Sequence, residues 1–152
     1  MRLKKPASIF LLLALLAISC TKQKSIKFIP LKQFNITDTL VDKDGKRSLS
    51  RTEHFIIENY RDNEKSEKAI DRFSKSLINS TQLQKFQSVF YKSSEKTNLK
   101  GLKENPRDLA RYSQDNDLIY IFYYSNGKFL FKQKWDKGKI IDPKNDINVT
   151  IN

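Results

Sequence analysis

The sequence predicts a small α+β domain in which an antiparallel sheet is packed by one main helix. Two patterns carry this prediction: an aromatic hairpin over residues 118–135 and an amphipathic helix over about residues 63–79. Aromatic residues make up 11% of the 152-residue chain, whereas disordered chains are poor in aromatics. A packed core is therefore expected, in a chain of single-domain length.

The sequence before the helix predicts β-strands. Residues 28–50 indicate a short strand, a turn at Asp44-Gly45 and a weaker second strand, because Asp-Gly is typical of hairpin turns. The letters DKDG of this turn also resemble a calcium loop. Gly45 follows Asp42 too closely for an EF-hand, however, so a turn is favoured and no metal site is expected. Residues 52–60 favour a strand slightly over a helix.

His54 lies in this last run and is the only histidine of the chain. One histidine cannot form a histidine-based metal site without carboxylate ligands, and no catalytic partner for it is evident in the sequence. A structural or surface role is therefore expected for His54.

The helix prediction rests on one apolar stripe and two ion pairs. Apolar residues recur at helical spacing: Ala69, Ile70, Phe73 and Leu77. Acid-before-base pairs four residues apart are expected on the opposite, solvated face: Glu64 with Lys68, and Asp71 with Lys75. The alternating residues 83–96 then predict a further strand, and Pro106 opens a short helix.

The strongest local signal is Asn126-Gly127, which predicts a two-residue hairpin turn. Counting outward from this turn without a bulge pairs Phe122 with Phe131. One face of the hairpin then carries an aromatic patch: Tyr120, Phe122, Tyr124, Phe129, Phe131 and Trp135. The first strand is apolar on both faces and is expected to be central. Lysines along one face of the second strand predict an edge strand.

Within this patch, Tyr120, Tyr124 and Trp135 are the candidate ligand-binding residues, because they could line a pocket between helix and sheet; the alternative is that they are core. Ser93–Lys96 matches the S-x-x-K pattern of penicillin-binding enzymes. Its companion motifs are absent, and the spacing recurs by chance in a chain rich in serine and lysine. No catalytic residue and no cofactor are assigned, and the chain is not expected to be an enzyme.

The one strongly apolar stretch, IFLLLALLAISC, spans residues 9–20 and ends on the only cysteine. It is too short to cross a bilayer, which takes about 20 apolar residues, but it fits the core of an export signal. Basic residues precede it, as such signals require: Arg2, Lys4 and Lys5.

The small residues Ala17-Ile18-Ser19 before Cys20 resemble the lipobox of bacterial lipoproteins. This resemblance covers only about the first 20 residues. It implies that residues 1–19 are a cleaved signal peptide, that Cys20 is acylated, and that residues 20–27 tether a single domain over 28–152. It also implies a lipid-anchored place in the cell envelope, on the periplasmic side of the outer membrane. A plain secretory signal with an incidental cysteine is the alternative.

The chain carries a net charge of +12. In an exported protein this charge indicates anionic headgroups, lipopolysaccharide phosphates or acidic envelope proteins rather than nucleic acid; solubility alone is the alternative. The expected function is a membrane-anchored, non-enzymatic binding protein. The alternatives are an immunity protein that neutralises a toxin in the periplasm, and a small ligand-binding domain or hydrolase.

Overall fold

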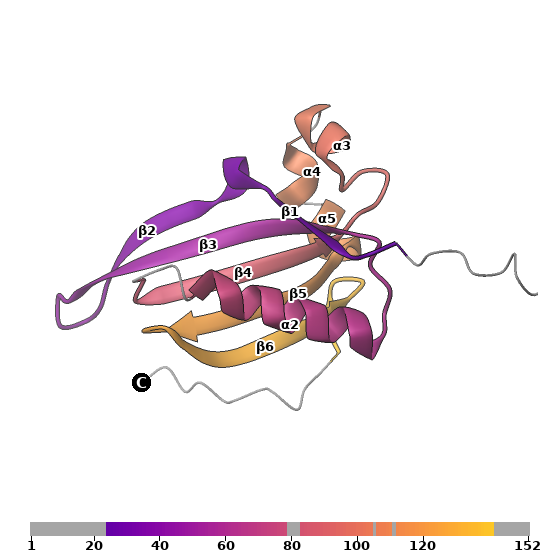
Figure 1. Ribbon diagram of the computed structural model, residues 1–152. Coiled ribbons are helices and arrows are strands. Elements are labelled where there is room, and N and C mark those ends of the chain that lie inside the picture. The colour runs from indigo at the N-terminus through magenta and orange to yellow at the C-terminus, as the bar shows by residue number, and fades with distance from the viewer. Residues whose placement is uncertain (1–23, 79–82, 105, 111, 142–152) are drawn as a thin grey trace, which may run out of the picture.

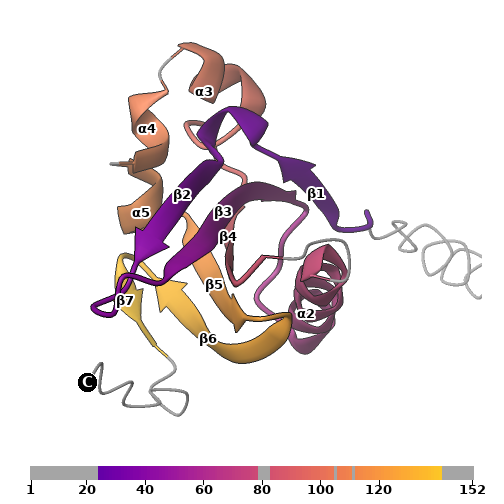
Figure 2. The ribbon, with the colours of Figure 1, turned by 90° about the vertical axis from the view of Figure 1, so that its left-hand side faces the viewer.

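The computed structural model describes residues 24–78, 83–104, 106–110 and 112–141, except the side chains of Asp108 and Ala110. The predicted signal peptide, Cys20 and the chain after residue 141 lie outside the described residues. The described part is an α+β fold, in which a seven-stranded mixed sheet has one long helix on one face and short helices on the other (Figures 1 and 2).

The strand order is β1-β3-β4-β5-β6-β7, with β2 also paired to β3. The strands are β1 (Lys27–Pro30), β2 (Ile36–Val41), β3 (Arg47–Glu58), β4 (Lys85–Lys92), β5 (Leu118–Ser125), β6 (Lys128–Asp136) and β7 (Lys139–Ile140). The helices are α2 (Glu64–Ile78), α3 (Leu99–Glu104), α4 (Arg107–Ala110) and α5 (Tyr112–Asn116), with a 3-10 turn η1 (Lys32–Phe34). Because β4 occupies one edge of β3, β1 and β2 follow each other along its other edge.

Strands β3 and β4 are parallel, whereas the other strand pairs of the described residues are antiparallel. Phe55 of β3 lies beside Phe90 of β4, for example. A parallel pair needs a long crossover, and α2 provides it by running back over the sheet (Figure 1). The expectation of a wholly antiparallel sheet was wrong at this pair, because the alternation within a strand does not reveal the direction of its neighbour.

Helix α2 packs on the sheet through residues one turn apart: Ser66, Ile70, Ser74 and Ile78. Asn63 caps the helix by accepting a hydrogen bond of 2.9 Å from the backbone N–H of Ser66. Ser74 is fully buried and shares hydrogen bonds of 2.7 Å with Ser88 and Tyr124. The buried hydroxyl at the centre of this interface is therefore satisfied.

An aromatic core surrounds this line of contact beneath α2. Phe73 stacks on Phe28 of β1, with ring centroids 4.1 Å apart, and Phe55 stacks on Phe90 at 5.4 Å. Offset and edge-to-face rings of this kind add to the stabilisation from buried area. Phe73 belonged to the predicted apolar stripe, and it packs against this cluster as a partly buried residue.

The opposite face carries a second cluster, which the short helices cover. Its buried members are Leu31, Ile56, Val89, Tyr91, Leu102, Leu109 and Leu118. Helix α3 lies so close to the preceding loop that a Cβ on Gly101 would be 2.7 Å from the carbonyl oxygen of Lys96. Packing by one main helix is therefore an incomplete description, since α3, α4 and α5 cover part of the other face (Figure 2).

Both predicted hairpin turns form. Asn126 and Gly127 have φ values of 49° and 73°, the pair of positive angles that defines a type I′ turn. In the β2–β3 turn, the carboxylate of Asp42 accepts hydrogen bonds from the backbone N–H groups of Asp44 (3.0 Å) and Lys46 (2.8 Å). The DKDG sequence thus organises its own backbone through Asp42.

Candidate functional site

A β-bulge in β6 decides which side chains face α2. Tyr124 pairs with Phe129 as predicted, but Tyr123 pairs with Phe131, so Leu130 is an extra residue on β6. Beyond the bulge β6 is shifted by one residue, which moves each side chain to the other face of the sheet. The predicted aromatic patch is therefore wrong beyond Phe129.

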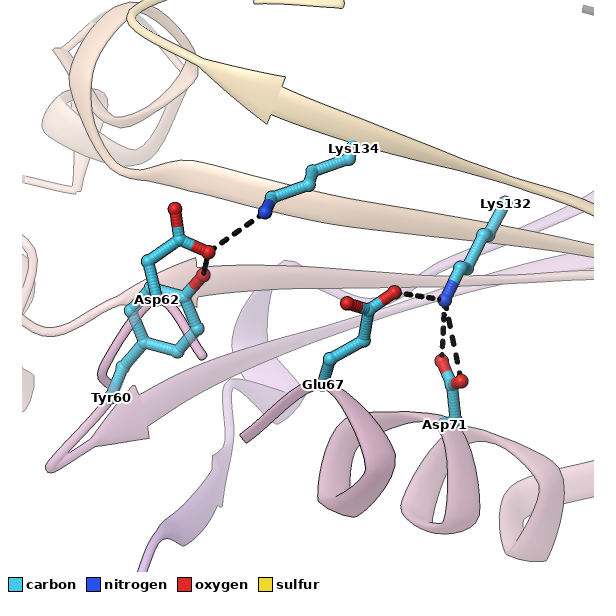
Figure 3. Close-up of polar contacts among 6 residues, drawn as sticks. All are labelled: Tyr60, Asp62, Glu67, Asp71, Lys132 and Lys134. Carbon is cyan, nitrogen blue, oxygen red and sulfur yellow. Dashed lines mark hydrogen bonds and ion pairs between the residues drawn. The ribbon is translucent and has the colours of Figure 1, made fainter. Parts of the chain in front are cut away.

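The shift places lysines where aromatic residues were expected. Lys132 lies beside Phe122, and Lys134 lies beside Tyr120. Both lysines therefore point to the face that α2 covers (Figure 3). Phe131 stacks on Tyr123 on the opposite face, with centroids 4.3 Å apart.

Lys132 joins the first turns of α2 to β6. Its Nζ donates hydrogen bonds to Oε1 of Glu67 at 2.6 Å and Oδ1 of Asp71 at 3.1 Å (Figure 3). The predicted Glu64–Lys68 pair does form, at 2.6 Å. Asp71, however, turns towards the sheet to meet Lys132 instead of pairing with Lys75 on a solvated face.

Lys134 makes the second connection, to the segment before α2. Its Nζ donates to Oδ1 of Asp62 at 2.7 Å, and the hydroxyl of Tyr60 donates to the same oxygen at 3.4 Å (Figure 3). We call Lys132, Lys134 and their three carboxylate partners, Asp62, Glu67 and Asp71, the α2–β6 clasp.

The pKa shifts in and beside the clasp keep Lys132 and Asp62 charged and Tyr60 neutral at physiological pH. Burial opposes the charge on Lys132, but its hydrogen bonds to Glu67 and Asp71 outweigh burial and hold its pKa above the ordinary value. The hydrogen bond from Lys134 lowers the pKa of Asp62. Burial, followed by the nearby charge of Asp62, raises the pKa of Tyr60 to about 12. A general acid or base at neutral pH needs a pKa near 7, and these three shifts all lead away from it.

The three candidate ligand residues are not brought together. Tyr120 and Tyr124 are buried in the aromatic core beneath α2, whereas Trp135 packs against the second cluster on the opposite face. The indole Nε1 of Trp135 is buried without a hydrogen-bond partner among the described residues. The bulge at Leu130 explains this separation, because it moves Trp135 away from the face of Tyr120.

His54 lies on the same face as Trp135, where its Nδ1 is 3.2 Å from the hydroxyl of Tyr91. Burial lowers the pKa of His54 to about 4, so the imidazole is neutral at physiological pH. Its backbone is held as well: the N–H donates to Oδ1 of Asn35 at 3.1 Å, and the carbonyl accepts from Leu31 at 2.8 Å. These contacts give His54 a structural role.

The serine-rich loop before α3 forms a buried polar network. Oδ2 of Asp117 accepts hydrogen bonds of 2.6 Å from the hydroxyls of both Ser94 and Thr97. Lys96, the last residue of the S-x-x-K match, lies over the ring of Tyr112, with Nζ 4.6 Å from its centroid. The arrangement ties the loop to the start of β5 and gives Lys96 an aromatic partner.

The edge strand β2 is open to solvent along its whole length. All six of its residues are exposed, and within the described residues β2 pairs only with β3. Its sequence, ITDTLV, contains no lysine or proline, the residues that commonly protect an edge strand. Composition alone did not reveal this edge, because only the pairing shows which side of β2 lacks a neighbour.

Large apolar side chains are exposed along this region. On β2 and the start of β3 they are Ile36, Leu40, Val41 and Leu49. Phe129 and Leu130 are exposed beside the β5–β6 turn. The β2–β3 turn and the β5–β6 turn lie at the end of the sheet away from residue 24, where the described chain begins (Figure 1).

Over the ranges described, no group of three or more His, Cys, Asp or Glu side chains is placed to hold a metal ion. None of the helices within these ranges is long and apolar enough to cross a bilayer. The chain as a whole matches no protein-family model, no curated protein and no solved structure.

Proposed function

We propose that this chain is a lipid-anchored interaction protein of the bacterial cell envelope. Acylated Cys20 would hold it on the periplasmic side of the outer membrane, and the folded domain would bind another envelope protein without catalysing a reaction. The observation that carries the anchoring is the basic and apolar signal-like segment ending in Ala17-Ile18-Ser19-Cys20.

The unprotected β2 edge supports the binding part of the proposal. An exposed edge strand offers backbone N–H and C=O groups to an incoming strand, and β-strand addition is a common mode of peptide recognition. The matching partner is an extended segment of another protein. Its side chains would meet Ile36 and Leu40 on one face of the sheet, and a basic residue could pair with Asp38 between them.

The position of the β2 edge relative to the proposed anchor fits this arrangement. The described chain begins at Lys24, close in sequence to Cys20, whereas the β2–β3 and β5–β6 turns, beside which Val41, Phe129 and Leu130 are exposed, lie at the opposite end of the sheet (Figure 1). A domain tethered near Lys24 would present β2 and the β5–β6 turn away from the point of attachment.

The test is crosslinked co-purification from the protein's own membranes with a photoreactive amino acid at position 39 of β2. A discrete crosslinked partner is expected, and it should be lost in Leu40→Lys and retained in Leu99→Lys. The two leucines are 40% and 43% exposed, and Leu99 lies in α3, so Leu99→Lys is a matched control. Equal crosslinking in both variants would refute the β2 site.

Cys20→Ala tests the anchor in the same experiment. Intact mass should show acyl groups on the wild type and none on the variant, and the variant should leave the membrane fraction. A wild-type protein without acyl groups would refute the anchoring. If the captured partner is a toxin, the chain is an immunity protein, and deletion strains should then be killed by sibling cells.

A further inference from the structure

A basic cavity lies where the described chain begins. It has a volume of about 260 Å³ and is formed by residues 24–26, by residues 59 and 61 after β3, and by the first turns of α2. Four of the nine lining residues are cations, and none is acidic: Lys24, Arg61, Lys65 and Arg72. Segments distant in sequence thus bring four positive side chains around one space.

The four cations are not neutralised by neighbouring carboxylates. None of them takes part in an ion pair of the described residues. The acids adjacent in sequence to three of them pair with other lysines: Asp62 with Lys134, Glu64 with Lys68 and Asp71 with Lys132. An anion in the cavity would therefore meet positive charge without competition from these acids.

The wall of the cavity is held in place. Ile26 packs against the aromatic core beneath α2. The side-chain amide of Asn59 donates a hydrogen bond of 2.9 Å to the carbonyl oxygen of Ser25, and Asn59 itself adopts a left-handed φ of 59°. This contact fixes residues 24–26 beside α2, so the cavity exists before a ligand arrives.

The position of the cavity relative to Cys20 identifies a source of anions. Lys24 lines the cavity and follows Cys20 by four residues. An extended chain spans at most about 3.6 Å per residue, so the Cα atoms of these two residues lie within roughly 15 Å of each other. If Cys20 is acylated, as proposed above, the cavity must lie at or near the headgroups of the anchoring leaflet.

We infer that this cavity binds the phosphate-bearing headgroup of an anionic phospholipid in the membrane that anchors the protein. Arginine and lysine donate charge-assisted hydrogen bonds to phosphate oxygens. The apolar walls at Ile26 and Ala69 suit the glycerol and methylene groups beside the phosphate. This inference rests on the proposed anchoring. It adds a second, headgroup-specific attachment that orients the domain.

Native mass spectrometry of the full-length protein, purified from its membranes and delipidated in detergent, tests this site. Phosphatidylglycerol is the probe, phosphatidylcholine is the neutral comparison, and inorganic phosphate is added as a competitor. We expect phosphatidylglycerol adducts on the wild type. They should weaken by roughly 10- to 100-fold when Arg61, Lys65 and Arg72 are all changed to glutamine.

The matched control changes Lys43, Lys46 and Lys128 to glutamine. These exposed lysines lie at the two hairpin turns of the opposite end, so the control removes the same charge from another surface. Its phosphatidylglycerol binding should stay within about threefold of the wild type. Salt screens the electrostatic interaction between exposed charges beyond about 10 Å, so lysines at the far end should contribute little to binding in the cavity. Equal losses in both triple variants would overturn the inference in favour of a general charge effect.

A second variant keeps all four cations and fills the space. Ala69→Leu places a larger side chain in the cavity wall at a helix position that tolerates leucine, and it should weaken phosphatidylglycerol binding at unchanged net charge. Equal binding of the two lipids would overturn the site, as would unchanged binding by Ala69→Leu. Displacement of the lipid by millimolar phosphate would identify free phosphate as the ligand instead.

The same spectra separate this inference from the proposed anchoring, because the intact mass reports the acyl groups on Cys20. Acylated protein without cavity-dependent adducts would overturn the headgroup site and leave the anchor. Protein without acyl groups but with cavity-dependent adducts would refute the anchor and retain the ligand.

Discussion

The two faces of the sheet are covered in different ways. The face under α2 is closed by one helix with an aromatic core, a buried serine–tyrosine contact and the α2–β6 clasp. The opposite face is closed only in part, by short helices held through Asp117 and by the partly buried contact of His54 with Tyr91. Long-helix packing therefore stabilises one face, whereas local polar contacts fix the other and leave the β2 region open.

Among variants that test this comparison, the largest loss of stability is expected from Asp117→Ala. The variant leaves the hydroxyls of Ser94 and Thr97 without their carboxylate acceptor, and Thr97 is fully buried. We expect the free energy of unfolding to fall by about 2–4 kcal/mol, measured by urea denaturation. The exposed Glu104→Ala should cost less than about 0.5 kcal/mol. A similar small loss in both variants would show that the network does not hold this face.

Acid should weaken the same face through His54. Its pKa is about 4 in the fold, below the ordinary value near 6.5, so the unfolded chain binds the extra proton first. Stability from this group is fully present above about pH 6.5 and falls as the pH drops towards 4. Since the ring is only partly buried, we expect a loss of about 1–3 kcal/mol over this window.

His54→Gln provides the comparison, because glutamine does not titrate. Its unfolding free energy should change less between pH 7 and pH 4.5 than that of the wild type, in urea titrations at both pH values. Identical pH dependence in the two proteins would exclude His54 as the source.

On the other face, Lys132→Met tests the clasp. Lys132 is 17% exposed, and its removal leaves Glu67 and Asp71 unpaired beside each other. Because the two carboxylates are 37% and 32% exposed, solvent screens part of this cost. We expect a loss of about 1–2 kcal/mol.

Lys134→Met is the internal control for the clasp. Its partner Asp62 is 68% exposed, so the loss should stay below about 1 kcal/mol. Thermal and urea unfolding of the two variants should therefore rank Lys132 above Lys134. The reverse order would contradict the role assigned to the buried side of the clasp.

The smallest effect is expected in the open region. Leu40→Lys and Leu99→Lys replace exposed leucines of similar exposure, so each should change the unfolding free energy by less than about 0.5 kcal/mol. Urea denaturation checks this. A loss above about 1 kcal/mol in Leu40→Lys would mean that β2 is part of the stabilising structure, and its effect on partner capture would then have a folding explanation.

Local sequence patterns predicted much of this fold. Features that depend on residues far apart in the sequence were not predicted. Asn126-Gly127 identified its turn because few residue pairs accept two positive φ angles, and the apolar repeat identified α2. The bulge at Leu130 escaped prediction because Phe129, Phe131 and Trp135 alternate with Lys132 and Lys134, a pattern that fits an unbulged strand with one aromatic face and one lysine face. The parallel pairing of β3 and β4 depends on residues far apart in sequence, which periodicity does not connect.

The candidate sites were hidden for the same reason. Lys132 faces inward only because of the bulge and because Glu67 and Asp71 lie above it on α2. The basic cavity combines three separate segments, each of which is an ordinary polar stretch when taken alone. The lipid anchor, by contrast, is predicted from one continuous apolar run ending at Cys20 and stays a prediction.

The parallel β3–β4 pair also constrains the order of folding. The β5–β6 hairpin closes a two-residue turn, and hairpins form within about 1–10 μs. The β3–β4 register instead joins residues such as Thr52 and Gln87, which are 35 positions apart, and non-local pairing slows folding. A chain emerging amino end first would therefore expose the free edge of β3 until β4 had followed it out. During that interval, a chaperone that covers extended strands would have its clearest target.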